Sequence, residues 1–183
     1  MVIIVIIILV VIFALISTYN SLIQSRNKVK NSWSQIDVQL QRRFELIPNL
    51  VETVKGYMKH EEETLAKVTE LRTSWANAKT VNEKAGLDNQ LSGVLKTIMA
   101  VSENYPDLKA NQSFIGLEQE LKETENKISY ARQFYNDSVT IYNTKVETIP
   151  TNIVASLFGF KVEELYKVDS EEAKNNVKVN FNE

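Results

Sequence analysis

The chain has 183 residues, with 21 basic and 23 acidic side chains, one histidine and no cysteine. This length allows one domain of ordinary size or two small ones. Without cysteine, the chain has no disulfides, no thiolate chemistry and no zinc site built on thiolates. A formal charge of −2 argues against a general nucleic-acid binder, which needs a basic surface. Five glycines and three prolines are too few for a sandwich or barrel, so the composition favours an all-helical fold.

The first segment has the length and composition of a membrane anchor. Val2–Ile16 is an unbroken apolar run, and with Met1 and the residues through Tyr19 the uncharged stretch reaches nineteen residues. At about 1.5 Å per residue it spans roughly 28 Å, enough to cross a hydrocarbon core. The alternatives are a buried core helix and a cleavable signal peptide. A signal peptide is disfavoured because no Lys or Arg precedes the run and no A-x-A site follows it. We therefore expect residues 1–18 to be an uncleaved anchor in the lipid bilayer.

Charges beside the anchor indicate its orientation. Arg26, Lys28 and Lys30 follow the apolar run, whereas only the α-amino group precedes it. Because cytoplasmic flanks carry the excess of Lys and Arg, the pattern predicts a single-pass protein of the cell membrane. Its body is expected in the cytoplasm and its N-terminus outside.

After the anchor, apolar residues recur at spacings of three and four in four successive stretches. Such heptad-like stripes indicate buried helix faces, and short joints between them predict antiparallel neighbours with coiled-coil-like packing. The fold expected is therefore all-α, with an N-terminal transmembrane helix and an antiparallel four-helix bundle over residues 19–150. The stripes are Leu22, Val29, Trp33, Ile36, Leu40 and Ile47; Leu50, Val54, Tyr57, Thr64, Val68, Leu71 and Trp75; Leu87, Leu91, Val94, Ile98, Val101 and Tyr105; and Phe114, Leu117, Leu121, Ile128, Ala131, Tyr135 and Tyr142.

Pro48 is the first residue after the anchor that interrupts a helix. No breaker separates the anchor from the first stripe, so the two are predicted to form one long helix. At Pro48 this helix either kinks or ends. We favour an end, with Pro48 at the first position of a new helix and a tight turn that lets the chain return.

Residues 151–183 form a C-terminal apolar segment and tail. Asn152–Phe160 is apolar, and helical spacing suggests that its larger side chains Ile153, Val154, Leu157 and Phe158 share one side. The segment can pack over the bundle or lie at the membrane surface, and packing on the bundle is favoured because so short a helix is weak alone. Val177–Phe181 alternates like a strand, which would lie along the bundle or be disordered.

A search for catalytic or metal-binding motifs finds none. The only histidine, His60, begins an acidic run, but Thr64 stands where a helical zinc site would need its second histidine. The chain also lacks a glycine-rich phosphate loop. We expect no enzyme activity, no metal and no cofactor.

Three Tyr-Asn pairs form the most distinctive polar pattern. Two of them are seven residues apart on the predicted fourth helix, whose end returns to the start of the first helix in an antiparallel bundle. The pairs and nearby basic and amide residues are therefore expected to cluster near the membrane. Cross-helix hydrogen bonds that fix register are one interpretation, and a ligand or partner site is the other. The cluster comprises Tyr19, Asn20, Arg26, Asn27, Arg132, Tyr135, Asn136, Tyr142 and Asn143.

Arg42 and Arg43 are expected at the membrane-distal tip, roughly 36 Å of helix beyond Tyr19. Two adjacent helical residues point in different directions, so at least one should reach solvent and could meet an acidic partner. The alternative is that both only solvate the tip and neutralise a helix C-terminus. Replacement of both by glutamate is expected to leave folding nearly intact.

The same residues carry a family resemblance. Tyr19-Asn20, Arg26-Asn27 and the block Trp33–Tyr57 resemble the start of LemA-family proteins. Residues 131–143 and Gly159-Phe160 are similar to that family's C-terminal half, as is the closing Val177–Phe181. Residues 77–112 match least. The resemblance implies a single-pass bacterial membrane protein with a four-helix bundle, and it implies no established activity, cofactor or catalytic residue.

These observations favour a membrane-anchored scaffold or protein-interaction module of unsettled molecular role. The alternative is a ligand-sensing or signalling module that relays to a partner. A sensor needs a polar cavity inside the bundle, whereas a scaffold has a dry core and an exposed patch. The expected contacts are the bilayer, through residues 1–18, and an unidentified protein, but no nucleic acid. The sequence leaves the oligomeric state open.

Overall fold

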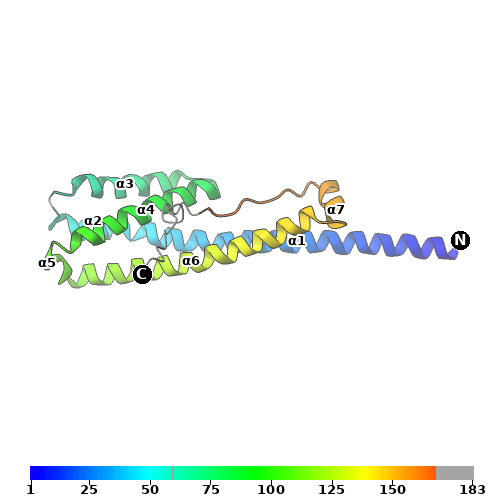
Figure 1. Ribbon diagram of the computed structural model, residues 1–183, viewed down its shortest axis with the longest axis horizontal. Helices are drawn as coiled ribbons and strands as arrows, with labels where there is room; N and C mark the ends of the chain where they lie inside the picture. Colours follow the sequence, from blue (N-terminus) through cyan, green and yellow to red (C-terminus); the bar gives the residue numbers. More distant parts are fainter. Residues whose placement is uncertain (59, 168–183) are drawn as a thin grey trace, which may run out of the picture. The chain divides into compact units, whose positions relative to one another are not determined.

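The computed structural model describes residues 1–58 and 60–167. Within these residues the chain forms helices and no strands, which confirms the all-α prediction. The strand-like pattern at residues 177–181 lies outside the described part. The helices are α1 (Val2–Glu45), α2 (Ile47–Lys55), α3 (Glu62–Asn77), α4 (Val81–Ser102), α5 (Pro106–Lys109), α6 (Gln112–Glu147) and α7 (Thr151–Leu157) (Figure 1).

The helices belong to two compact units. The first unit contains Met1–Leu46 and Ile115–Tyr166, and the second contains Ile47–Phe114 and, of the described residues beyond Tyr166, Lys167. This division differs from the boundaries near residues 18 and 150 that the sequence suggested. Of the described residues beyond 150, residues 151–166 group with α1 and α6, and Lys167 belongs to the second unit.

The anchor and the first soluble stripe form one helix, as predicted. α1 runs unbroken from Val2 to Glu45 because no glycine or proline interrupts it. All residues of its first part, Val2–Ile16, are exposed. Among the described residues this is the one helix that is long and apolar enough to cross a membrane, judged by length and composition. The finding is consistent with membrane anchoring.

The interruption near Pro48 is smaller than predicted. Only Leu46 lies between α1 and α2, and its dihedral angles remain helical, with φ −75° and ψ −19°. Pro48 occupies the second position of α2 rather than the first. Both early positions tolerate proline because their N–H groups have no partner inside the helix. The backbone at this point is a one-residue break, and the expected tight turn is absent there.

The second predicted helix is in fact two helices of the second unit. α2 ends at Lys55, just before Gly56, and α3 begins at Glu62. Glycine weakens a helix interior, and the acidic pair Glu62 and Glu63 is favourable in the first turn of a new helix. The apolar stripe alone did not reveal this break.

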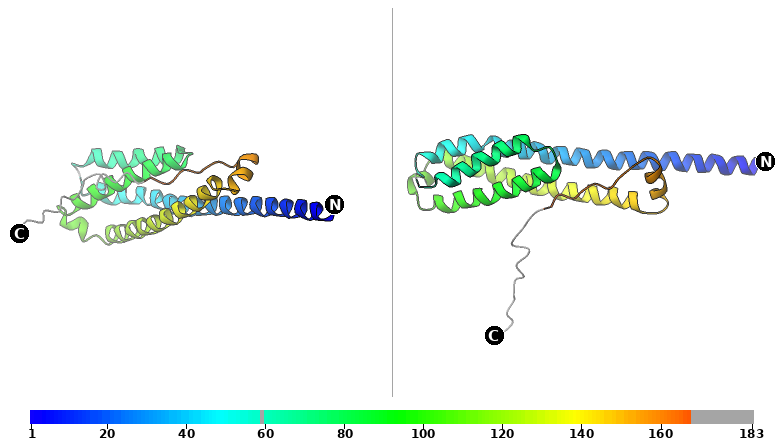
Figure 2. Two further views of the ribbon diagram at one scale, coloured as in Figure 1. Left: turned by 45° about the vertical axis from the view of Figure 1, so that its right-hand side comes forward. Right: turned by 90° about the horizontal axis from the view of Figure 1, so that it is seen from above.

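α3 and α4 form a hairpin in the second unit. They lie side by side, and a short loop at residues 78–80 joins them (Figures 1 and 2). Thr80 begins α4 with a capping box: its hydroxyl accepts a hydrogen bond from the Glu83 N–H at 3.1 Å, and the Glu83 carboxylate accepts one from the Thr80 N–H at 3.0 Å. The buried interface uses the predicted stripes, among them Val68, Leu71 and Leu91.

In the first unit, α6 runs antiparallel to the soluble part of α1 (Figure 2). Arg43 near the end of α1 pairs with Glu125 early in α6, while Lys145 near the end of α6 donates to the Ser21 hydroxyl at 2.9 Å. Buried positions recur every seven residues on both helices, as a shared helix–helix interface requires. They include Leu22, Val29 and Ile36 on α1, and Leu121, Ile128, Tyr135 and Tyr142 on α6.

α7 corrects the expectation for the apolar segment. Val154 and Ala155 are buried, and α7 contacts α1. However, Ile153 and Leu157 are 65% and 74% exposed, so Val154 does not share a side with them. The predicted packing therefore holds for only one side of α7. Successive residues of a helix are rotated by about 100°, so Val154 points away from Ile153.

Candidate functional site

The segment of the first unit that follows α7, residues 158–166, is called the strap here; it turns at Phe158 and Gly159 and runs extended from Phe160. Its start is set by Gly159, whose φ of +69° ends α7. The Phe160 N–H donates to the Ala155 carbonyl at 2.9 Å and the Gly159 N–H donates to the Ser156 carbonyl at 3.3 Å. This pair of bonds is a Schellman motif, which needs a residue in the left-handed region and so favours glycine. The motif sends the chain back along α6 in extended form.

Two tyrosines of α6 donate hydrogen bonds to strap carbonyls. The Tyr142 hydroxyl donates to the Lys161 carbonyl and the Tyr135 hydroxyl donates to the Glu164 carbonyl, both at 2.9 Å. Burial raises the pKa of Tyr135 to about 12, with Glu163 and Glu164 adding to the shift. Burial also raises the pKa of Tyr142. Both hydroxyls therefore stay protonated and remain donors at neutral pH.

The neighbouring asparagines pair with the strap backbone as an adjacent strand would. Asn143 accepts from the Glu163 N–H at 2.9 Å and donates to the Glu163 carbonyl at 2.8 Å. Asn136 accepts from the Tyr166 N–H at 2.8 Å and donates to the Tyr166 carbonyl at 3.2 Å. A carboxamide carries one acceptor and one donor group side by side, so each asparagine satisfies both backbone groups of one strap residue.

The two Tyr-Asn pairs fit the strap because two repeat lengths coincide. Seven residues of helix rise about 10.5 Å, and three extended residues span about 10 Å. A step from Tyr142-Asn143 back to Tyr135-Asn136 therefore moves three residues further along the strap. This is the shift seen from Lys161 to Glu164.

Side chains of α1 contact the aromatic residues of the strap. The Tyr19 ring lies 4.8 Å from the Phe158 ring, and the Arg26 guanidinium lies 5.0 Å from the centre of the Phe160 ring. Such contacts between a cation and an aromatic face stabilise the partly buried pair. These α1 residues are seven apart, like the α6 pairs, and the next position in the series is Trp33.

The far end of the strap is fixed by the Tyr166 ring. It is 2% exposed, with the Arg132 guanidinium 4.9 Å from its centre. Trp33 lies near it at 6.4 Å and meets Tyr135 edge to face at 5.8 Å. The strap is therefore anchored by buried aromatic rings at both ends, with the polar pairs between them.

The structure brings most of the predicted cluster together, but through the strap. Tyr19, Arg26, Arg132 and both α6 pairs contact it. Asn20 and Asn27 lie exposed on α1 and take no part in these contacts. Trp33 was predicted only as a core residue, and Tyr166 was not predicted to belong to the site. Tyr166 could have been recognised as the one aromatic residue in the charged stretch from Lys161 to Lys167.

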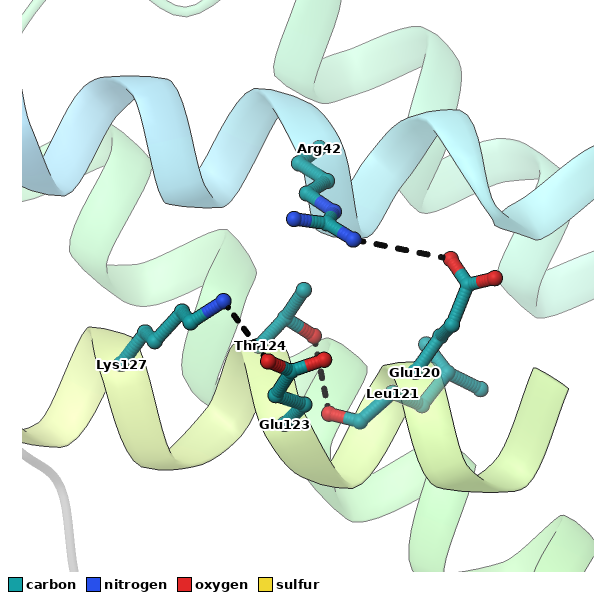
Figure 3. A network of polar contacts seen from close by, with 6 residues as sticks. All are labelled: Arg42, Glu120, Leu121, Glu123, Thr124 and Lys127. Atoms are coloured by element: carbon teal, nitrogen blue, oxygen red, sulfur yellow. Dashed lines mark hydrogen bonds and ion pairs between the residues drawn. The ribbon is translucent and has the colours of Figure 1, made fainter. Parts of the chain in front are cut away.

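The two predicted tip arginines behave differently. Arg42 is half-exposed, and its guanidinium lies 3.9 Å from the Glu120 carboxylate (Figure 3). Nearby, Lys127 donates to Glu123 at 2.9 Å, and this bond, with Arg42 as a weaker contributor, lowers the pKa of Glu123. Arg43 is 3% exposed and lies 2.6 Å from Glu125. The expectation that both can be reversed in charge without harm to folding therefore fits Arg42 alone.

A groove lies on the opposite flank of α6, between α6 and α1. Its volume is about 540 Å³, and it is open to solvent. Val38, Tyr130 and Phe134 contribute apolar surface, with exposed fractions of 58%, 75% and 44%. The Lys28 ammonium lies 5.4 Å from the centre of the Phe134 ring. Polar side chains complete the lining, namely Ser34, Gln35, Gln39 and Lys127.

The chain matches known proteins over most of its length. A sequence model of the LemA family matches residues 32–181. The chain belongs to the LemA family. It is 27% identical to "Protein LemA" of Metamycoplasma hominis over 164 residues, which cover 86% of this chain and 75% of the relative. It is 25% identical to "Magnetosome protein MamQ 2" of Paramagnetospirillum magneticum over 179 residues, covering 84% of this chain and 66% of that protein.

The region that matches the LemA family includes the strap residues and the α6 pairs, but it does not include Tyr19 or Arg26. Within residues 1–58 and 60–167, no three His, Cys, Asp or Glu side chains lie close enough to form a metal site. Among the described residues, the site binds the strap, a segment of the same chain, through hydrogen bonds and aromatic contacts.

The asparagine pairs generate a residue-specific prediction. Asn143→Ala removes two hydrogen bonds to Glu163, and Asn136→Ala removes two to Tyr166. At about 1 kcal/mol per bond, local opening of the strap should rise roughly 30-fold at the affected residue. Hydrogen exchange of the full chain in detergent should show Glu163 faster in the first variant and Tyr166 faster in the second. Equal acceleration of both amides in either variant would contradict independent pairing.

The tip arginines generate a second prediction. Arg43→Glu places a buried carboxylate beside Glu125 and should lower the free energy of unfolding by more than about 3 kcal/mol. Arg42→Glu changes a half-exposed side chain and should cost less than about 1 kcal/mol. Denaturation of both variants and of Arg43→Met measures the difference. Similar losses for Arg42→Glu and Arg43→Glu would show that burial of Arg43 does not matter.

Proposed function

We propose that this chain is a non-enzymatic scaffold that is anchored in the cell membrane by the apolar part of α1 and binds a protein partner through the groove between α1 and α6. Support for the anchor comes from the exposed apolar run Val2–Ile16 and its hydropathy. Family membership is consistent with a membrane-anchored helical protein.

The single observation that supports protein binding is the exposed apolar surface of the groove. Tyr130 and Phe134 lie one turn apart on α6, and Val38 faces them from α1. Exposed apolar patches rimmed by polar residues mark interaction sites, and aromatic side chains supply much of the binding energy at such sites. The polar rim here comprises Ser34, Gln35, Gln39 and Lys127.

The sensor alternative has less support. A sensing function needs a site that encloses a small ligand and contacts it with polar groups. The groove between α1 and α6 is open to solvent, and so is one of about 630 Å³ beside Glu63 and Lys67 in the second unit. An open apolar groove suits a macromolecular partner better than a small ligand.

The partner is proposed to be cytoplasmic. Arg26, Lys28 and Lys30 follow the anchor, and the positive-inside rule then puts the groove on the cytoplasmic side. The absence of cysteine makes this testable with one introduced thiol.

For topology, Ser129→Cys places a thiol at an exposed position of α6. A membrane-impermeant maleimide should leave it unlabelled in intact spheroplasts and label it after lysis. Full labelling without lysis would reverse the orientation.

For partner binding, a photo-crosslinking residue at Tyr130 should capture a discrete protein in native membranes. The same residue at Ser129, which points about 100° away on the helix, is the matched control. Phe134→Asp should reduce capture from position 130 at least about tenfold, since loss of a buried aromatic contact costs about 1.4 kcal/mol or more. Because Phe134 is partly exposed, helix content should not change.

Equal capture from positions 130 and 129, or capture that Phe134→Asp leaves unchanged, would exclude the groove as the binding surface. A captured product with twice the mass of the chain would identify the partner as a second copy.

A further inference from the structure

The corner between α6 and α7 carries an apolar surface that the rest of the first unit does not cover. Thr148–Phe160 contains no charged residue. Within it, Ile153 and Leu157 lie one turn apart on α7 and are 65% and 74% exposed, and Ile149, in the turn before α7, is 82% exposed. Together with Phe158, which is 55% exposed, they form what we call the α7 apolar face. The opposite side of α7 is buried through Val154 and Ala155.

This face lies beside the membrane end of α1. The Phe158 ring is 4.8 Å from the Tyr19 ring, at the end of the uncharged N-terminal stretch, and α7 contacts α1. Figures 1 and 2 show α7 beside α1, where α6 ends. The part of α1 beyond this point, toward the N-terminus, has no α6 beside it. The α7 apolar face therefore adjoins the end of the uncharged stretch of α1.

The length of the anchor places the membrane boundary at the same level. Val2–Ile16 spans about 22 Å of helix, which is shorter than a hydrocarbon core of about 30 Å. A short apolar stretch draws adjoining residues into the membrane or thins the bilayer around it. Extension to Tyr19 brings the span to about 27 Å. Lipid then reaches the residue that Phe158 contacts.

We propose that the α7 apolar face inserts into the boundary between headgroups and acyl chains of the membrane that α1 spans. Each apolar side chain that leaves water contributes in proportion to its buried area, and short amphipathic segments bind membranes in this way. The lack of charge from Thr148 to Phe160 removes the main cost of insertion. The occupant of this face is lipid rather than a protein.

The consequence is a second membrane contact that limits rotation and tilt of the first unit. A protein held by a single transmembrane helix can rotate about the axis of that helix. A unit held in the membrane through both α1 and α7 cannot. The groove at Tyr130 and Phe134 would then face a fixed direction relative to the bilayer. This inference rests on the proposed anchoring of α1.

The test uses the full chain, purified and reconstituted into vesicles of phosphatidylcholine and phosphatidylglycerol. A fluorescent label is placed on one introduced cysteine at a time, and lipids with a quencher on the acyl chain report contact. Leu157→Cys probes the α7 apolar face and Phe13→Cys reports the anchor. Leu165→Cys is the matched control, since Leu165 is also an exposed leucine but lies five extended residues, about 17 Å, beyond Phe160.

Quenching is expected at positions 157 and 13, but not at position 165. Ile149→Asp combined with Ile153→Asp should abolish quenching at position 157 and leave that at position 13, with unchanged helix content because both isoleucines are exposed. Quenching at position 13 without quenching at 157 would overturn this inference alone, whereas its loss at both positions would overturn the anchoring. The label at position 157 could instead be shielded from water but not quenched by lipid, with shielding that rises with protein concentration. That result would assign the α7 apolar face to a second copy of the chain and also overturn the inference.

Discussion

An extended segment packed against helices leaves its backbone N–H and C=O groups without the partners that a sheet would supply. At the buried Tyr166, loss of both partners would cost about 1–3 kcal/mol for each group, whereas the exposed residues 161–165 can bond to water instead. The strap meets this constraint with side chains of α6, because Asn136 and Asn143 bond both backbone groups of one residue each. The arrangement depends on the near equality of seven helical and three extended residues, so the spacing of the two Tyr-Asn pairs determines where the strap can lie.

The strap also explains how α1 and α6 stay together at the end nearer the apolar part of α1. At the other end of the pair, the buried Arg43 meets Glu125 directly. Beside the apolar part of α1, Tyr19 and Arg26 contact strap rings, while Tyr142 and Asn143 bond the strap backbone. The strap thus mediates much of the contact between the two helices, supplemented by the bond from Lys145 to Ser21.

The sequence predicted the elements that depend on local pattern and missed those that depend on distant partners. The heptad stripe and the absence of breakers gave α1 as one helix, and the seven-residue spacing placed Tyr135 and Tyr142 on one face. The strap could not be predicted because Lys161–Lys167 contains residues that favour helices, and its extended form depends on α6 side chains. The break at Gly56 was missed because apolar spacing continues across it. The sides of α7 were misjudged because a helix of seven residues offers too few positions to define a face.

The proposed binding groove and the strap use different flanks of α6. Tyr130 and Asn136 are six residues apart, which places them roughly 120° apart around the helix, and Phe134 is further still from Asn136. A partner in the groove would therefore contact α6 without displacing the strap. Because the strap bonds one flank of α6 and contacts α1, it fixes the backbones that line the groove before a partner arrives. A rigid surface loses less conformational entropy on binding, and so the strap contributes to recognition without touching the partner.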